Sequence, residues 1–301
     1  MDRNSVNWSG AMPAITTPFR GNGQLDEAAL GASIERHLAL GATGIVAGGC
    51  TGEFWAMSAA ERARLIAAAK EAIGTRATLI AGTGCVGVDD TVALTLEAER
   101  IGCDGVLILP PYFVRLTDDE IFAHYRDVTA RIGLPVMLYN IPGNAVNALT
   151  PALVARLALL ERVVAVKESS GDWNNFHATL LAVQNQLRVF CGPSSVFGVP
   201  AVQLGADGVI DCFPNVWDEG GQTMFEAARA GETVKAAALQ ATGRRLTDLF
   251  TSEGRTLYPS TKAAMTMLGI PGGGALRAPL RALDGAALAG LERGLRAEGL
   301  L

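Results

Sequence analysis

A lysine and a tyrosine each follow a short apolar run, at positions where they could take part in imine chemistry. Lys167 follows the apolar residues 163–166, and Tyr139 follows the apolar residues 136–138. Such runs are typical of buried strands. Burial disfavours a charged ammonium and lowers the pKa of a lysine, and a neutral amine is the nucleophile that forms a Schiff base with a ketone. The pattern therefore predicts a lysine nucleophile beside a phenol that shuttles protons.

Eight apolar runs alternate with amphipathic stretches, which predicts a parallel sheet. The expected strands are residues 14–17, 44–47, 78–81, 105–109, 136–139, 163–167, 189–191 and 208–211. Helices are expected at 58–73, 89–101 and 118–131, among others, with Ser58 and Thr117 at their starts. We expect the sheet to close into a (β/α)8 TIM barrel. The alternative, an open doubly wound sheet, usually carries a glycine-rich phosphate loop in its first turn, and residues 16–19 are not one.

The chain continues with helical patterns after the last expected strand. These patterns lie roughly at 217–230, 232–250, 259–268 and 279–296. A barrel needs only one helix after its eighth strand. We therefore expect the barrel to occupy residues 1–230 and a C-terminal helical extension to occupy residues 231–301.

The carboxyl ends of the strands build the active site of such a barrel. After the second strand, residues 48–53 form a glycine-rich turn that contains Cys50 and Thr51. Its backbone N–H groups and a hydroxyl can hold a carboxylate or a phosphate, although no P-loop lysine accompanies them. Asp211 ends the eighth expected strand. Two interpretations of it are equally open: a solvated carboxylate at the strand end, or a second catalytic acid.

Composition excludes several classes of partner. The net charge of -5 provides no basic surface for nucleic acid, and no apolar stretch approaches the length of a membrane span. The N-terminus lacks the pattern of a signal peptide. The five scattered cysteines form no C-x-x-C pair, which argues against zinc and disulfides and favours the cytoplasm. His37, His124 and His177 are expected at the surface, and no metal site is predicted.

A series of short motifs, in the right order, resembles the dihydrodipicolinate synthase/N-acetylneuraminate lyase family of class I pyruvate aldolases. Together they span nearly the whole chain, and the resemblance implies a (β/α)8 barrel with a C-terminal helical extension, usually assembled as a homotetramer from two dimers. The motifs are Gly49-Cys50-Thr51-Gly52-Glu53, Gly82-Thr83-Gly84, Pro111-Tyr112, Tyr139-Asn140-Ile141-Pro142, Val166-Lys167-Glu168-Ser169-Ser170-Gly171-Asp172, Gly205-Ala206-Asp207-Gly208-Val209-Ile210 and Pro259-Ser260-Thr261-Lys262.

The same resemblance implies roles for individual residues. Lys167 would form an imine with the ketone of pyruvate or another 2-keto acid, and Tyr139 would shuttle protons. The N–H groups of Cys50 and Thr51, with the Thr51 hydroxyl, would bind the carboxylate beside the ketone, and Ile210 would also contact the substrate. No metal or organic cofactor is implied, because the imine itself acts as the electron sink. Further possible site residues are Tyr112, Gly192 and Ser194.

Three positions depart from the family's synthases and bear on the substrate. Those enzymes carry a threonine where this chain has Cys50, and a second tyrosine that reaches across a dimer where it has Phe113. They carry an arginine that binds the aldehyde's carboxylate where it has Asn144. The N-acetylneuraminate lyases place acidic residues after the seventh strand, where Ser194 and Ser195 stand here.

These departures favour a Schiff-base-forming lyase that acts on carbon–carbon or carbon–oxygen bonds of a 2-keto acid. The hypothesis is an aldolase or dehydratase of 2-keto-3-deoxy sugar acids, with Asn144 among the groups that would bind hydroxyls. The first alternative is 4-hydroxy-tetrahydrodipicolinate synthase, which joins pyruvate to aspartate semialdehyde. The second is a non-catalytic protein that binds keto acids. The presence of both Lys167 and Tyr139 favours an enzyme over such a binder.

Overall fold

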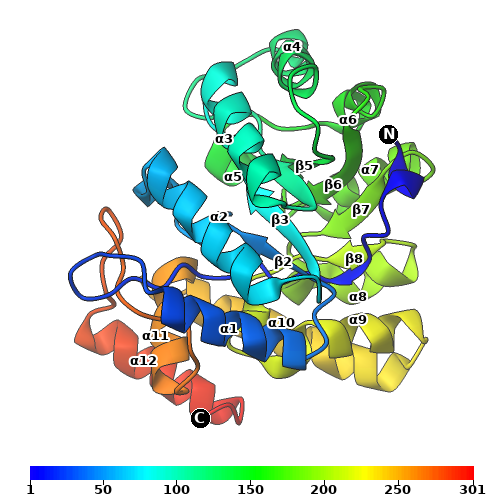
Figure 1. Cartoon of the computed structure of the whole chain (residues 1–301). Helices are drawn as coiled ribbons and strands as arrows, with labels where there is room; N and C mark the ends of the chain where they lie inside the picture. Colours follow the sequence, from blue (N-terminus) through cyan, green and yellow to red (C-terminus); the bar gives the residue numbers. More distant parts are fainter.

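Eight parallel strands form a single sheet at the centre of the molecule (Figure 1). The computed structural model describes all 301 residues. Neighbouring strands follow the order β1-β8-β7-β6-β5-β4-β3-β2, so each strand from β2 to β8 pairs with the next in sequence and β1 pairs with β8. The strands are β1 (Gly10–Ala11), β2 (Gly44–Ala47), β3 (Thr78–Gly82), β4 (Gly105–Ile108), β5 (Val136–Asn140), β6 (Val163–Glu168), β7 (Arg188–Cys191) and β8 (Gly208–Val209).

The sheet closes into a barrel through the residues that follow β1. Ala14 forms an isolated parallel bridge with Val46 of β2, and the Val46 amide donates to the carbonyl of Pro13 at 2.9 Å. The predicted (β/α)8 barrel is thereby confirmed. The first strand was expected at 14–17, which is wrong. Pro13 has no N–H group and interrupts the regular ladder, and beyond Ala14 the Thr16 hydroxyl donates instead to the Gly272 carbonyl at 2.7 Å.

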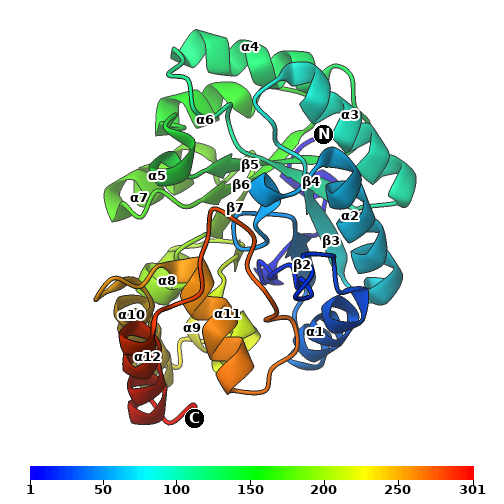
Figure 2. The same ribbon diagram turned by 90° about the vertical axis from the view of Figure 1, so that its left-hand side faces the viewer.

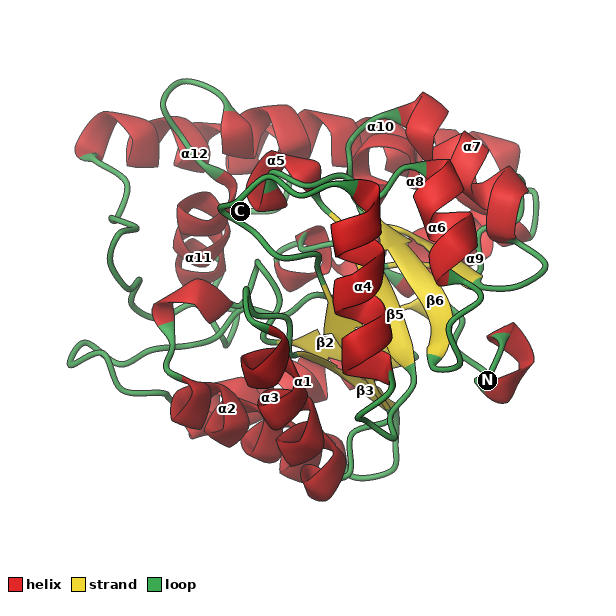
Figure 3. Ribbon diagram, turned by 90° about the horizontal axis from the view of Figure 1, so that it is seen from above, coloured by secondary structure: helices red, strands yellow, loops and turns green.

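Helices surround the strands on all sides, as the view from above shows (Figure 3). Ser58 and Thr117 cap their helices, and each forms the reciprocal capping box that its sequence predicts. The helices that accompany the strands are α1 (Glu27–Ala39), α2 (Ala59–Ile73), α3 (Val88–Ile101), α4 (Asp118–Thr129), α5 (Pro142–Ala145), α6 (Pro151–Leu157), α7 (Trp173–Val183), α8 (Ser194–Gln203) and α9 (Gln222–Arg229).

Three more helices follow α9 and lie together on one side of the barrel (Figure 2). They are α10 (Thr233–Thr251), α11 (Leu257–Met267) and α12 (Gly285–Ala297). The first of them packs against α8 and α9. Neither it nor any other helix has the length and apolar character that crossing a membrane requires. The division of the chain at residue 230 stays a prediction.

Small and medium-sized apolar side chains fill the inside of the barrel. Ile80, Leu107, Met137, Ala165 and Phe190 come from five successive strands and belong to one buried cluster. A larger cluster lies between the strands and the helices. Side chains alternate along a strand, so the residue two positions after an inward side chain also points inward. Tyr139 and Lys167 stand two positions after Met137 and Ala165.

Two of the three histidines are buried, contrary to the expectation from the sequence. His37 is 1% exposed, and its Nε2 lies 3.2 Å from Oδ1 of Asn215. His124 packs edge-on against the ring of Tyr125. Both stand on the helix faces that pack inward, which the polar composition of the surrounding segments conceals. His177 is partly exposed.

Candidate active site

Lys167 and Tyr139 lie side by side on neighbouring strands. They are register partners across β5 and β6, and Nζ of Lys167 lies 4.4 Å from the centroid of the Tyr139 ring. Met137 and Ala165, two residues earlier on each strand, point into the barrel, and the alternation of a strand gives both site residues the same direction. The structure therefore brings together the two residues that the sequence singled out for imine chemistry.

Burial sets the protonation of both side chains. Lys167 is 6% exposed, and desolvation lowers its pKa from the usual value, while nearby negative groups, including Asp211, act in the opposite direction. Desolvation raises the pKa of the Tyr139 phenol. A lysine with a lowered pKa is more readily the neutral nucleophile. The phenol stays protonated and can donate a proton to a developing oxyanion.

The two side chains line a cavity of about 170 Å³. That volume corresponds to roughly six water molecules, which suits a small acid. Residues predicted from the sequence form part of its wall: Cys50, Thr51, Tyr139, Lys167, Gly192, Ile210 and Asp211. The C-terminal part of the chain contributes residues that the sequence analysis missed: Thr247, Thr251, Leu257 and Tyr258.

The turn after β2 contributes backbone to the cavity because its glycines allow a tight path. Gly48 has a φ of 70°, and a side chain on Gly52 would lie 3.0 Å from the Thr17 hydroxyl. That hydroxyl donates to the Gly52 carbonyl at 2.6 Å. Cys50 and Thr51 are both buried at this turn. Desolvation raises the pKa of the Cys50 thiol, so it carries its proton.

Asp211 is buried and accepts three hydrogen bonds from protein groups. Its carboxylate accepts the Ser195 amide at 2.8 Å, the Ser194 hydroxyl at 3.2 Å and the Cys212 amide at 2.6 Å. It is therefore not the solvated strand-end carboxylate that was one of the two possibilities. Ser194, which the sequence predicted as a possible site residue, does not line the cavity and only donates to Asp211, whereas Ser195 lines it.

Asn144 is exposed at the rim of the cavity, and its side chain contacts Tyr258, which is distant in sequence. Its Nδ2 donates to the hydroxyl of Tyr258 at 3.3 Å. Tyr258 stands in the first turn of α11 and lines the cavity with Lys167. The signal for it in the sequence was its place directly before the Pro259-Ser260-Thr261-Lys262 motif, but that motif does not say which strand end the helix faces.

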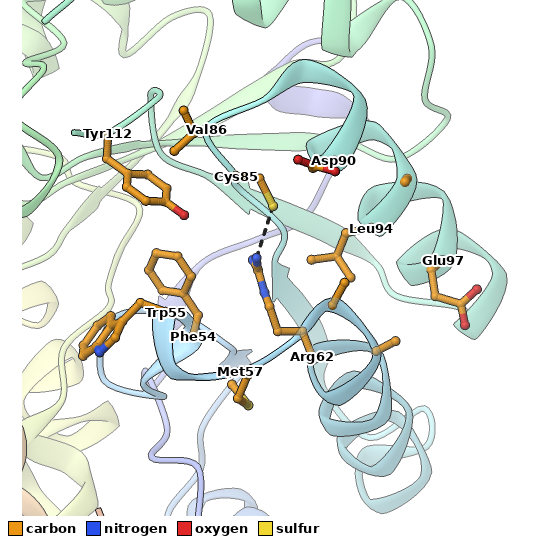
Figure 4. Close-up of a pocket in the computed structure, with 13 residues that line it drawn as sticks. Phe54, Trp55, Met57, Arg62, Cys85, Val86, Asp90, Leu94, Glu97 and Tyr112 are labelled. Atoms are coloured by element: carbon orange, nitrogen blue, oxygen red, sulfur yellow. Dashed lines mark hydrogen bonds between the residues drawn. The ribbon is translucent and has the colours of Figure 1, made fainter. Parts of the chain in front are cut away.

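Tyr112 and Phe113 do not line this cavity. Tyr112 belongs to a second cavity of about 500 Å³ between α2 and α3, where it packs edge-on against Phe54 (Figure 4). In the same cavity, Arg62 points toward Cys85, with Nη1 3.3 Å from the sulfur (Figure 4). Phe113 is 88% exposed and has a φ of 79°. Within one chain, neither side chain reaches Lys167.

Comparison with known proteins accounts for almost the whole chain. The profile of the "Dihydrodipicolinate synthetase family" matches residues 7–298. The chain is 37% identical to 4-hydroxy-tetrahydrodipicolinate synthase 1 of Streptomyces coelicolor over 290 residues, which cover 96% of this chain and 94% of the relative. A crystal structure of dihydrodipicolinate synthase superimposes with a TM-score of 0.90 at 30% identity, covering 98% of this chain and all of the other. The pyruvate complex of YagE from Escherichia coli K12 superimposes with a TM-score of 0.92 at 26% identity, covering 98% of this chain and all of the other.

Proposed function

This chain belongs to the dihydrodipicolinate synthetase family, whose members are lyases of the class I aldolase type, and from that premise we propose that it forms an imine between Lys167 and pyruvate. The observation that carries the proposal is the buried contact of 4.4 Å between the Lys167 amine and the Tyr139 ring inside the cavity. The pyruvate complex of the similar YagE structure supports the same keto acid.

The chemistry follows from the positions of these groups. The neutral Lys167 amine attacks the ketone carbon of pyruvate, and the oxygen departs as water after it has taken up protons. In this proposal Tyr139 supplies such a proton, since its buried phenol stays neutral. The N–H groups of Cys50 and Thr51 would hold the neighbouring carboxylate. The resulting imine withdraws electrons, so a proton or a carbon substituent can leave the adjacent carbon and an enamine forms.

The second substrate distinguishes two candidate functions. The names of the relatives favour the alternative of the sequence analysis, 4-hydroxy-tetrahydrodipicolinate synthase, over its main hypothesis. In that function the enamine of pyruvate would attack aspartate semialdehyde. Identities of 34–37% over more than nine-tenths of this chain support this candidate first.

One feature of the cavity favours the other candidate, a lyase of 2-keto-3-deoxy sugar acids. No arginine is among the residues that line it, so a single chain offers no guanidinium for the carboxylate of aspartate semialdehyde. Instead, Ser195, Thr247 and Thr251 are among the residues that line the cavity. Hydroxyl groups of this kind suit the hydroxyls of a sugar acid.

Borohydride trapping tests the proposal. The protein would be incubated with pyruvate and borohydride and its intact mass measured, with Lys167→Ala as the matched control. We expect one pyruvyl adduct on the wild-type chain and none on the variant. An unmodified wild-type chain would overturn the pyruvate proposal.

Two assays on the same preparation then separate the candidates. One measures condensation of pyruvate with aspartate semialdehyde, and the other measures pyruvate release from a panel of 2-keto-3-deoxy acids. Trapping without turnover in either assay would favour the third hypothesis, a keto-acid-binding protein without catalysis. The absence of a cofactor and the homotetramer expected from the sequence stay predictions.

A further inference from the structure

Tyr258 brings a second phenol to the cavity from the C-terminal part of the same chain. It lines the cavity together with Lys167 and Tyr139. Its hydroxyl accepts a hydrogen bond from Asn144 at 3.3 Å, and its ring lies 5.4 Å from that of Trp55. The phenol is therefore held on two sides, by a ring contact and by a polar contact at the rim.

A buried ion pair fixes the helix that carries this phenol. Lys262 stands four residues after Tyr258 on α11, so both point to the same side of the helix. The Lys262 ammonium lies 2.5 Å from Oε1 of Glu53, and both side chains are at most 2% exposed. Glu53 follows the turn that contains Cys50 and Thr51. The position of Tyr258 relative to that turn is thus set by the core of the protein.

The Cys50 thiol lines the same cavity as the two phenols. Side-chain hydrogen bonding with Tyr139 and with Tyr258 lowers the pKa of this thiol, against the larger effect of desolvation. Desolvation raises the pKa of all three groups, so each carries a proton at neutral pH. Three neutral, proton-bearing groups around one cavity of about 170 Å³ can pass a proton along the series, whereas Phe113 has no hydroxyl and is exposed away from the cavity.

We propose that Tyr258 is the outer member of a proton path within one chain, which runs from Tyr258 through Cys50 to Tyr139 and serves imine formation at Lys167. The inference rests on the proposed function. It assigns to helix α11 a positioning and proton-transfer role in the site, and it makes the proton supply independent of any phenol from a second copy of the chain.

The step balances as follows in atoms and charge. In the carbinolamine, the bond between carbon and the hydroxyl oxygen breaks, and the nitrogen lone pair forms the C=N bond. The departing oxygen takes the Tyr139 proton and leaves as water. Tyr139 regains a proton from the Cys50 thiol, the thiol from Tyr258, and Tyr258 from solvent at the rim near Asn144. One proton from solvent is consumed, and a protonated imine and one water are formed.

Tyr258→Phe tests the inference because it keeps the ring against Trp55 and removes only the hydroxyl. The rate of pyruvyl adduct formation would be followed by quenching with borohydride at short times. We expect the rate to fall by about 100-fold or more, as for the loss of a general acid, while the final amount of adduct stays the same. Added imidazolium buffer should restore part of the rate, which a purely structural defect would not allow.

Tyr125→Phe is the matched control. It removes a phenol that donates to the Ile108 carbonyl at 2.9 Å in the core, away from the cavity, and we expect the wild-type rate. If Tyr258→Phe forms adduct at the wild-type rate, or if buffer acids do not restore its rate, the proton path is wrong. A wild-type chain that forms no adduct would instead overturn the proposed function.

Variants at Cys50 keep the inference testable if Tyr258→Phe does not fold. Cys50→Ala interrupts the path at its middle and should lower the rate of adduct formation by a similar factor. Cys50→Ser keeps a proton-bearing group at the same place and should retain most of the rate. Equal rates for the alanine and serine variants would overturn the path.

Discussion

Lys167 is the residue at which burial and charge compete most directly. Desolvation lowers its pKa, and negative groups nearby, including the buried carboxylate of Asp211, act against that shift. Since desolvation is the larger cause, the folded protein favours the neutral amine more than water does. In the proposed function, this burial would prepare the Lys167 amine as a nucleophile before pyruvate arrives.

The pH dependence of trapping should therefore reveal this competition. We expect the rate of pyruvyl adduct formation on the wild-type chain to rise with pH, with a midpoint below the ordinary lysine value of 10.5. In Asp211→Asn, the ammonium loses an attractive charge, so the midpoint should move to lower pH. The rate would be measured across pH by quenched trapping and intact mass.

The control for this series is Asp248→Asn, an exposed carboxylate on α10 that pairs with Arg244. It should leave the midpoint where it is in the wild-type chain. A midpoint that rises in Asp211→Asn would contradict the electrostatic account of Lys167.

The sequence predicted Lys167 and Tyr139 as site residues, but it did not predict all the residues that line the cavity. Lys167 and Tyr139 end apolar runs, and strand alternation then determines where their side chains point. Tyr258 lies in a helix whose local pattern says only that one face is buried. Which strand end that face meets depends on long-range packing, so the third proton-bearing side chain became visible only in the structure.

At the scale of elements, one buried ion pair joins the turn after β2 to helix α11. Besides Lys262, Glu53 accepts the Arg277 amide at 3.1 Å, and Lys262 donates to the Ala275 carbonyl at 2.7 Å. Glu53 itself has a φ of 55°, in the left-handed region. The pair, rather than a continuous strand or helix, holds the turn of Cys50 and Thr51 against the helix that carries Tyr258.

Removing the Lys262 charge should destabilise the protein, because the charge of Glu53 is then buried alone. We expect Lys262→Met to lower the free energy of unfolding by about 3–5 kcal/mol, because it leaves the Glu53 carboxylate buried without its counter-ion. Urea unfolding followed by circular dichroism would measure the loss. The double variant Glu53→Gln/Lys262→Met removes both charges and should recover part of it.

An exposed ion pair provides the control for the expected loss of stability in Lys262→Met. Arg244 and Asp248 are four residues apart on α10, and more than half of each side chain is exposed. Since exposed pairs contribute little, Arg244→Ala should leave the stability nearly unchanged. If Lys262→Met were as stable as Arg244→Ala, the buried pair would not be what holds α11 in place.

The elements themselves were largely predictable because strand runs and helix caps are local signals. The exception was the first strand, where Pro13 breaks the ladder and the barrel closes through the bridge between Ala14 and Val46 and the backbone hydrogen bonds around it. Closure is a property of the whole sheet, since it requires β1 to meet both β8 and β2. No pattern within residues 10–17 specifies where along the segment those two contacts fall.

For the molecule as a whole, a buried histidine links the first helix to the end of the barrel. The His37 ring on α1 contacts the Asn215 side chain, which follows β8. Asn215 uses its Nδ2 to donate to the carbonyls of Ala14 and Cys212. Its Oδ1 therefore accepts from the ring, which places a proton on Nε2 of His37. Because burial lowers the pKa of His37 to about 4, the ring is neutral at pH 7. The contact joins α1, the bridge residue Ala14 and the last strand at the place where the barrel closes.

This closure should weaken in acid. Desolvation lowers the pKa of His37 from 6.5 to about 4, and that of His124 likewise. Between those values the unfolded chain binds more protons than the folded one, so the free energy of unfolding should fall as the pH falls from 6.5 to 4. Each histidine contributes at most about 1.4 kcal/mol per pH unit.

The variant His37→Gln tests this account and keeps a donor for Asn215. Denaturant unfolding at several pH values should show that its free energy of unfolding depends less steeply on pH than that of the wild-type chain. His177→Gln changes a partly exposed ring on α7 and should keep the wild-type slope, whereas an unchanged slope in His37→Gln would mean that acid opens the barrel elsewhere.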